Sequence, residues 1–248
     1  TTEIQSRIPG NMPATPVDPL VATQWHLTGT WGLHADQVRN DYAGGGSLVA
    51  VIDDGFQTNH YEFSANYRTD LDWDTLGNDG DPSPATSTTN NHGTAVTGII
   101  AGDDNGLLGT GVAFDAQIFG VRQGFGAQGN LDQTVAAFQH VFAKNADVMN
   151  NSWGYTAAFS DDFNREFGGT DFYAVENEII NLVNNGRGGL GTNIVFSGGN
   201  NRAAGENVNY HNHQNSPYII AVAAIDSDGT WSAFSNPGAA LLVAAGGT

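Results

Sequence analysis

Residues 48–60 read LVAVIDDGFQTNH, an apolar run that passes directly into two adjacent carboxylates, a glycine and a polar loop. A short apolar run of this kind is typical of a strand that is buried on both faces of a parallel sheet. An unpaired carboxylate at such a position is costly or takes up a proton, so Asp53 and Asp54 need a partner or a chemical role. The stretch therefore predicts a central strand with a functional site at its carboxyl end.

Four later stretches repeat the pattern of a short apolar run that ends in polar residues: 115–122, 146–153, 192–200 and 218–226. Helix-like stretches lie between or before them, at 93–102, 131–144 and 171–186. This alternation predicts an α/β fold in which a parallel sheet is flanked by helices on both faces. Functional groups in such sheets gather at the carboxyl ends of the strands, where Asp53 and Asn200 are expected to lie.

The sequence indicates one domain that follows an arm. Residues 1–20 contain four prolines and are expected to form an extended arm, and residues 21–248 form the domain. Residues 69–91 form a long, polar, turn-rich loop, and loops of this length are usually functional. The chain starts at Thr1 without a signal-like segment, which indicates a processed or trimmed product.

The composition excludes several classes of protein. The 248 residues carry 8 Lys and Arg against 26 Asp and Glu, a net charge of −18, so the basic face that nucleic acids require is missing. The acidic excess suits divalent cations, cationic substrates or a salty medium, or serves solubility alone. There is no cysteine, which excludes disulfides, thiolate metal sites and a cysteine nucleophile. No apolar run approaches the roughly 20 residues of a membrane span.

Three residues stand out as candidates for chemistry, although each has an ordinary alternative role. His92 opens a helix-like stretch within NNHGTAVTGIIAG, where it can be a surface or capping residue. Asp53 can be a helix cap or a cation ligand. Asn200, in SGGNN, can be a turn residue.

Several motifs together are more specific than these residues alone. VAVIDDG, NHGTAVTGIIAG, GTGVA, NNSWG and GRGGLGTNIVFSGGN resemble the motifs of the subtilases, the subtilisin-like serine peptidases, and occur in the same order. The resemblance extends from about Asp18 to the end of the chain. DPLVATQWHL at 18–27, the paired DDG and GRGGLG at 186–191 are similar to the kexin and furin branch.

The resemblance implies catalytic roles. Asp53 would hold the His92 imidazole in one tautomer and stabilise its protonated form. His92 would act as general base towards a serine hydroxyl and as acid towards the leaving amine. The Asn200 amide would donate into the oxyanion hole. Asp54 would face the substrate residue next to the cleaved one and favour a basic side chain.

The resemblance also implies how substrate binds. An extended peptide would pair its backbone with Ser152 and Gly154 as an added strand, and SGG at 197–199 would form the facing wall. Trp153 is expected to be a packing anchor rather than a direct contact. The substrate-binding residues implied in this way are Asp54, Ser152, Trp153, Gly154, Ser197, Gly198, Gly199 and His211.

Two departures from the family pattern stand out. Ala157, His211 and Asn236 occupy positions where furin-like enzymes have acids that bind arginine or a calcium ion, so we expect a weaker or broader preference at the cleaved bond. The Gly-Thr-Ser motif of the nucleophile is absent, and Ser152, Ser197 and Ser235 lie in other contexts. We therefore expect the serine on a separate C-terminal fragment of the same precursor; a truncated chain and a natural non-catalytic relative are the alternatives.

The family's strongest calcium site has matching positions in this chain. They are Asp18, Glu62 and Asn105, with the carbonyls of Leu107 and Gly109. A plain solvated turn is the alternative for these residues. The loop at 70–82 gathers five aspartates, which predict either a further calcium site or an acidic flap that attracts basic substrate.

The function expected from these observations is a secreted, calcium-stabilised serine endopeptidase of bacterial origin that acts on peptides or proteins. The alternative is a catalytically silent subtilase-like module that binds peptides or a partner through the same groove. A nucleotide-binding domain fits poorly, because GGLGTN precedes a strand and offers phosphates no helix N-terminus.

Overall fold

The structure is a computed structural model that describes residues 18–63, 65–84, 90–163, 166–167 and 170–247. Most of the predicted arm, residues 1–17, lies outside the described residues. The described residues form nine strands and four α-helices, joined by short 3-10 helices. The strands are β1 Leu48–Asp53, β2 Trp73–Asp74, β3 Gln117–Arg122, β4 Val148–Asn151, β5 Glu166–Phe167, β6 Thr170–Asp171, β7 Asn193–Ser197, β8 Ile219–Ile225 and β9 Leu241–Gly246. The α-helices are α1 Trp25–Thr28, α2 His92–Ala101, α3 Leu131–Ala143 and α4 Phe172–Gly189.

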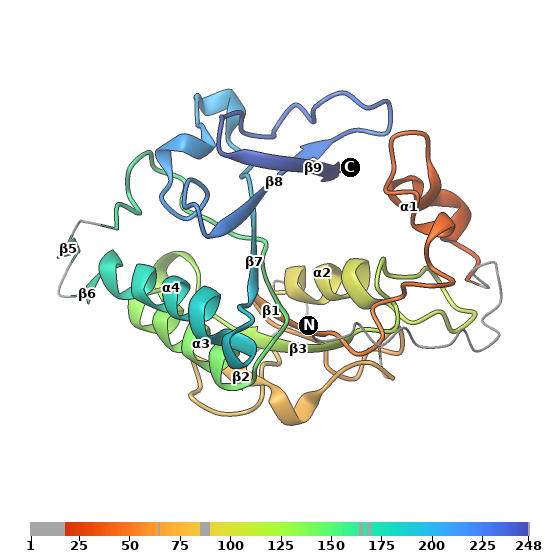
Figure 1. Ribbon diagram of the computed structural model, residues 1–248, viewed down its shortest axis with the longest axis horizontal. Coiled ribbons are helices and arrows are strands. Elements are labelled where there is room, and N and C mark those ends of the chain that lie inside the picture. Colours follow the sequence, from red (N-terminus) through yellow and green to blue (C-terminus); the bar gives the residue numbers. More distant parts are fainter. Residues whose placement is uncertain (1–17, 64, 85–89, 164–165, 168–169, 248) are drawn as a thin grey trace.

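Seven strands form one sheet in the order β2-β3-β1-β4-β7-β8-β9, and each of them is parallel to its neighbours. β5 and β6 form a separate antiparallel pair. Figure 1 shows α3 and α4 together beside the central strands, with α2 set apart from them and β8 and β9 extending beyond. The predicted parallel sheet with helices on both faces is confirmed.

The alternation of side chains along β1 explains the two layers of helices. Ala50 and Ile52 pack into a core with residues of α3 and α4, among them Phe138 and Leu182. Val49 and Val51, the intervening residues of β1, pack into a second core with residues of α2, among them Ala101. Since successive side chains of a strand point to opposite faces, one apolar run fills both cores. The buried core therefore fixes the carboxyl end of β1 from both sides.

Local sequence signals set the limits of the helices. Asn130 accepts a hydrogen bond from the backbone N–H of Gln133, 2.9 Å away, and the Gln133 side chain accepts one from the backbone N–H of Asn130, which is a capping box that starts α3. Regular helical geometry in α4 ends just before Gly186, because the backbone of Gly186 is extended and that of Arg187 and Gly188 is left-handed. The predicted helix at 171–186 therefore agrees with the regular part of α4.

Candidate active site

Asp53 and His92, which are far apart in the sequence, meet at the carboxyl edge of the sheet. Asp53 is the last residue of β1 and His92 is the first residue of α2. The Nδ1 atom of His92 lies 2.8 Å from Oδ1 and 3.0 Å from Oδ2 of Asp53. The hydrogen bond to Asp53 raises the pKa of His92 above its usual range, although partial burial of the ring opposes this. Since the carboxylate only accepts, Nδ1 carries the proton and Nε2 is left as the basic nitrogen.

The start of α2 packs closely against the end of β1. A Cβ atom at Gly93 would lie 2.6 Å from the carbonyl oxygen of Gly55 and 2.8 Å from the Cβ of Asp53, so only glycine allows this approach. The Asp54 carboxylate accepts from the backbone N–H groups of Gly93, at 3.0 Å, and of His92, at 3.4 Å. Asp54 thus caps the helix that carries His92. The sequence predicted a substrate contact for Asp54 and missed this helix-capping role.

Asn200 follows β7 and lines a cavity of about 280 Å³ at the same edge of the sheet. α2 forms the opposite side of this cavity through Ile99 and its neighbours. Asn236 holds the turn that presents Asn200: its backbone N–H donates to the carbonyl of Gly199 at 3.1 Å, and its Oδ1 accepts from the N–H of Asn201 at 2.8 Å. Asn236 is 4% exposed and therefore acts here as a support for the turn.

The two predicted substrate-binding walls come from neighbouring strands. Ser152 follows β4 and Ser197 ends β7, and these strands pair in parallel with Asn151 opposite Phe196. Ser152 and the stretch 197–199 line the same cavity as Asn200. The structure therefore brings the predicted walls together beside the candidate oxyanion-hole donor.

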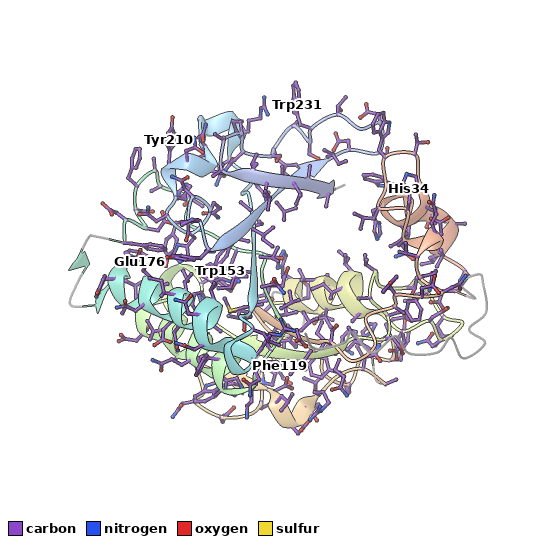
Figure 2. All side chains as sticks on the ribbon, viewed as in Figure 1. His34, Phe119, Trp153, Glu176, Tyr210 and Trp231 are labelled. Atoms are coloured by element: carbon purple, nitrogen blue, oxygen red, sulfur yellow. The ribbon has the colours of Figure 1, made fainter. Side chains whose placement is uncertain are left out.

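Trp153 packs against the larger core, as predicted for an anchor. Its ring lies edge-on to Phe196 at a centroid distance of 5.1 Å, and Figure 2 shows it in the interior, near α4. Together with Gly154 it also lines a larger cavity of about 830 Å³ next to α3. The Trp153 indole therefore lies between the larger core and this second cavity.

His211 lies in a buried cluster of charged groups rather than at the surface. His211 is 2% exposed. Nδ1 lies 2.9 Å from Oδ1 of Asp161, and Nε2 lies 3.0 Å from Oε2 of Glu206. The second oxygen of Asp161 pairs with Nδ1 of His213 at 2.9 Å. Carboxylates on both sides of one imidazole require both of its nitrogens to be protonated, so His211 is a buried cation.

The pKa values of this cluster follow from the hydrogen bonds. Burial alone would raise the pKa of Asp161, but hydrogen bonds from His211 and His213 outweigh it and hold the pKa well below the usual value. The hydrogen bond to Asp161 raises the pKa of His211, against the effect of burial. Ala157, another of the three positions predicted to lack an acid, is exposed.

The predicted calcium residues include carboxylates whose charge has no cationic partner among the described residues. Asp18 is 4% and Glu62 is 6% exposed, and one oxygen of Asp18 and both of Glu62 are buried without a hydrogen-bond partner. Burial raises the pKa of Glu62, and repulsion from Asp18 and Asp103 raises it further. A hard cation needs such oxygens, so these residues fit calcium.

The remaining predicted calcium residues surround the same carboxylates. Asn105 donates to the carbonyl of Tyr61 at 3.2 Å, and its Oδ1 accepts from the N–H of Leu107 at 2.9 Å. The loop is held to Asp18 by the N–H of Gly106, at 2.5 Å from Oδ1. Within the described ranges, no three His, Asp or Glu side chains are placed to hold a metal by themselves. Backbone carbonyls such as those of Leu107 and Gly109 would have to complete the ligand set.

The aspartates at 70–82 do not gather at one point. Asp70 pairs with Arg68 at 2.6 Å, and Asp74 pairs with Arg122 at 2.9 Å. Asp72 is buried and accepts from the N–H of Gly120 at 2.9 Å, and burial raises its pKa to about 7. Because these aspartates are dispersed and several of them have partners, their arrangement does not fit a second calcium site, which was one of the two alternatives that the sequence suggested.

Comparison with known proteins identifies the family. The sequence model of the Subtilase family, Peptidase_S8, matches residues 44–248. The chain belongs to the subtilase family. Among curated relatives of this subtilase, the "Dibasic-processing endoprotease" of Yarrowia lipolytica is 32% identical over 221 residues, and "Furin" of Bos taurus is 31% identical over 216 residues. The predicted family and its kexin and furin branch are therefore confirmed.

These relatives are much longer than the subtilase chain described here. Each alignment covers 84% of this chain, but only 21% of the Yarrowia protein and 26% of bovine furin.

Solved structures agree on the fold. The serine protease of Aeromonas sobria, in its complex with the chaperone ORF2, superposes with a TM-score of 0.80 at 23% identity, over 94% of this chain and 43% of that one. A protease from Pseudoalteromonas arctica gives 0.74 at 25% identity, over 94% and 72%.

Some functional features of this subtilase were missed at the level of sequence. The capping role of Asp54, the Asp161 partner of His211 and the added charge of Asp103 depend on contacts across the fold. Asp161 and His211 are separated by 50 positions, and no local pattern indicates that they meet.

None of the helices in the described residues is long and apolar enough to cross a membrane.

Proposed function

We propose that this subtilase is a serine endopeptidase whose Asp53–His92 pair activates a serine supplied from outside the described residues. The observation that carries the proposal is the 2.8 Å contact between Nδ1 of His92 and Oδ1 of Asp53. The His92 side chain is 55% exposed, whereas that of Asp53 is 3% exposed. The buried carboxylate orients the ring, and the open side of the ring is free to take a proton from a hydroxyl group.

Asn200 supplies the second element of the mechanism. Its carboxamide would donate to the oxyanion that forms when the serine attacks the peptide carbonyl. Such a donor lowers the barrier by roughly 3–4 kcal/mol, a magnitude that comes from a subtilisin, another member of this family, and not from the geometry of this chain. His92, protonated in the first step, then gives its proton to the leaving amine. Water completes the reaction by attack on the acyl group of the serine.

The serine is proposed to lie on a C-terminal fragment of the same precursor that packs beside α2. In the described part of the chain, the hydrogen bonds of the His92 ring run to Asp53 alone. Ile99 of α2, which lines the cavity next to Asn200, is 55% exposed, and Leu242 and Val243 of the edge strand β9 are 67% and 51% exposed. Exposed apolar surface of this extent favours a packed partner segment.

Calcium is proposed as a stabilising ion at Asp18, Glu62 and Asn105, with the carbonyls of Leu107 and Gly109. The ion would neutralise the carboxylates and tie the segment at residue 18 to the loop after α2. Its role would be structural, because the candidate residues are separate from the Asp53–His92 pair. Secretion is proposed together with calcium binding, since extracellular calcium concentrations suit sites of this kind.

Hydrolysis of a peptide library by the full-length protein tests the proposed function. We expect cleavage by the unmodified protein and loss of cleavage in His92→Ala. Gln139→Ala is a suitable control, because Gln139 is exposed on α3 and its carboxamide donates to Glu178 of α4 at 2.7 Å, away from the site. Peptide binding without any cleavage by the unmodified protein would contradict the proposal and support the silent binding module.

A further inference from the structure

Gln214 lies between the two substrate-binding walls. Its Nε2 donates to the carbonyl of Ser197 at 3.0 Å. On the other wall, a Cβ atom placed on Gly154 would lie 2.9 Å from the same nitrogen, so the carboxamide occupies the space that a side chain at Gly154 would need. The Gln214 side chain therefore spans the space between Gly154, three residues after β4, and Ser197, the last residue of β7.

The carboxamide of Gln214 is held in place. The residue is 3% exposed, and its Oε1 is buried without a hydrogen-bond partner among the described residues. The preceding residue, His213, is completely buried, and its N–H and Nδ1 both bond to Oδ2 of Asp161, at 3.1 and 2.9 Å. The His213 ring also stacks on Tyr155 at 5.4 Å. A side chain anchored next to this residue has little freedom to swing out of the space.

The charges behind Gln214 are already paired. Asp161 and Glu206 both bond to the imidazolium of His211, and Asp161 also bonds to His213. A long cationic substrate side chain would therefore meet a neutral carboxamide first, and the two carboxylates behind it already share the imidazolium of His211. Burial of a cation without a partner is strongly unfavourable.

We propose that Gln214 closes the pocket for the acyl-side residue, which is the substrate residue that contributes the carbonyl of the cleaved bond. The inference rests on the proposed endopeptidase function and specifies its substrate class: peptide bonds that follow a short, uncharged side chain such as alanine or serine. Gln214 is a specificity-determining residue in this proposal. It excludes long side chains by occupying the end of the pocket.

The acyl-side preference of the full-length protein tests this inference. Peptides that differ only at the acyl-side residue are compared by kcat/KM. For the unmodified protein we expect alanine and serine to exceed leucine, phenylalanine and arginine. In Gln214→Ala, the ratio of leucine to alanine peptides should rise by about 10-fold or more, because each methylene in an apolar pocket is worth about 10- to 200-fold. Gln214→Asn, which keeps the carboxamide but is one methylene shorter, should give an intermediate ratio.

The outcomes separate this inference from the proposed function. Gln139→Ala, the same exchange at the α3–α4 contact, should leave the ratio unchanged. Cleavage that is best after arginine, phenylalanine or leucine in the unmodified protein would overturn the role of Gln214 and leave the endopeptidase function intact, and this readout requires no variant to fold. An unchanged ratio in a folded Gln214→Ala or Gln214→Asn would overturn it as well. Absence of all cleavage would refute the endopeptidase function, and the inference with it.

Discussion

Replacement of His211 by alanine should destabilise the protein strongly. The imidazolium lies 2.9 Å from Asp161 and 3.0 Å from Glu206, and the three side chains are 3%, 0% and 12% exposed. The substitution removes the shared cation and leaves the two carboxylates facing an empty space. Asp161 keeps its bond to His213, whereas Glu206 loses the imidazolium with which it pairs.

The size of the effect follows from the burial of the cluster. Removal of one partner from a buried ion pair costs about 3–5 kcal/mol, because the remaining charge is buried without compensation. A domain of 150–250 residues loses about 2–4 °C in Tm for each kcal/mol. We therefore expect Tm to fall by about 6–20 °C in His211→Ala, measured by calorimetry at pH 6. Glu206→Gln should have a smaller effect, and Glu176→Gln on α4 is the matched control.

The same cluster predicts how stability depends on pH. The pKa of His211 is raised above its usual value of 6.5, so its contribution is fully present below pH 6.5 and is lost as pH rises through the raised pKa. The pKa of Asp161 is lowered from 3.8, so its contribution is present above pH 3.8 and is lost as pH falls through the lowered pKa. Tm should thus fall from pH 6 to alkaline pH, and this slope should shrink in His211→Ala. A change in Tm below about 2 °C in His211→Ala, or equal slopes in both proteins, would show that His211 is not a buried cation shared by the two carboxylates.

Three further predictions concern the catalytic pair, the cap of α2 and the calcium residues. Asp53→Asn should lower kcat by about 10⁴-fold in peptide hydrolysis with a small effect on Tm, because the ring loses the carboxylate that fixes its tautomer; a kcat within tenfold of the unmodified protein would contradict the assignment. Asp54→Ala should lower stability by about 0.5–2 kcal/mol through loss of the cap of α2, and Asp54→Asn by less, as measured by urea unfolding; equal losses would argue against the cap. EDTA should lower the Tm of the unmodified protein and affect Glu62→Gln less, and an EDTA-insensitive Tm would rule out the calcium site.

Much of the fold could be predicted from the sequence because the central strands are buried on both faces. β1, β3, β4, β7 and β8 are apolar runs that end in polar residues, and this pattern is distinct. β2 has two residues and α1 has four, too few to give a periodic signal. Short elements of this kind depend on the packing around them.

The catalytic pair could be predicted because its residues lie in motifs at the end of a strand and the start of a helix. The roles of Asp54 and His211 could not be predicted in the same way. Asp54 turns towards the first N–H groups of α2, which lie 38 and 39 residues away, and Asp161 lies 50 residues from His211. Contacts at such separations depend on the arrangement of the sheet rather than on the local pattern.

Covalent labelling by a fluorophosphonate is the sharpest test of whether the Asp53–His92 pair activates a serine, because the reagent attaches to a serine whose hydroxyl group is activated by a neighbouring general base. The labelled full-length protein would be digested and the modified residue identified by mass spectrometry, with His92→Ala as the control. We predict one labelled serine, C-terminal to residue 247, and no label in His92→Ala. A label on Ser152, Ser197 or Ser235, or label that persists without His92, would contradict the proposed mechanism.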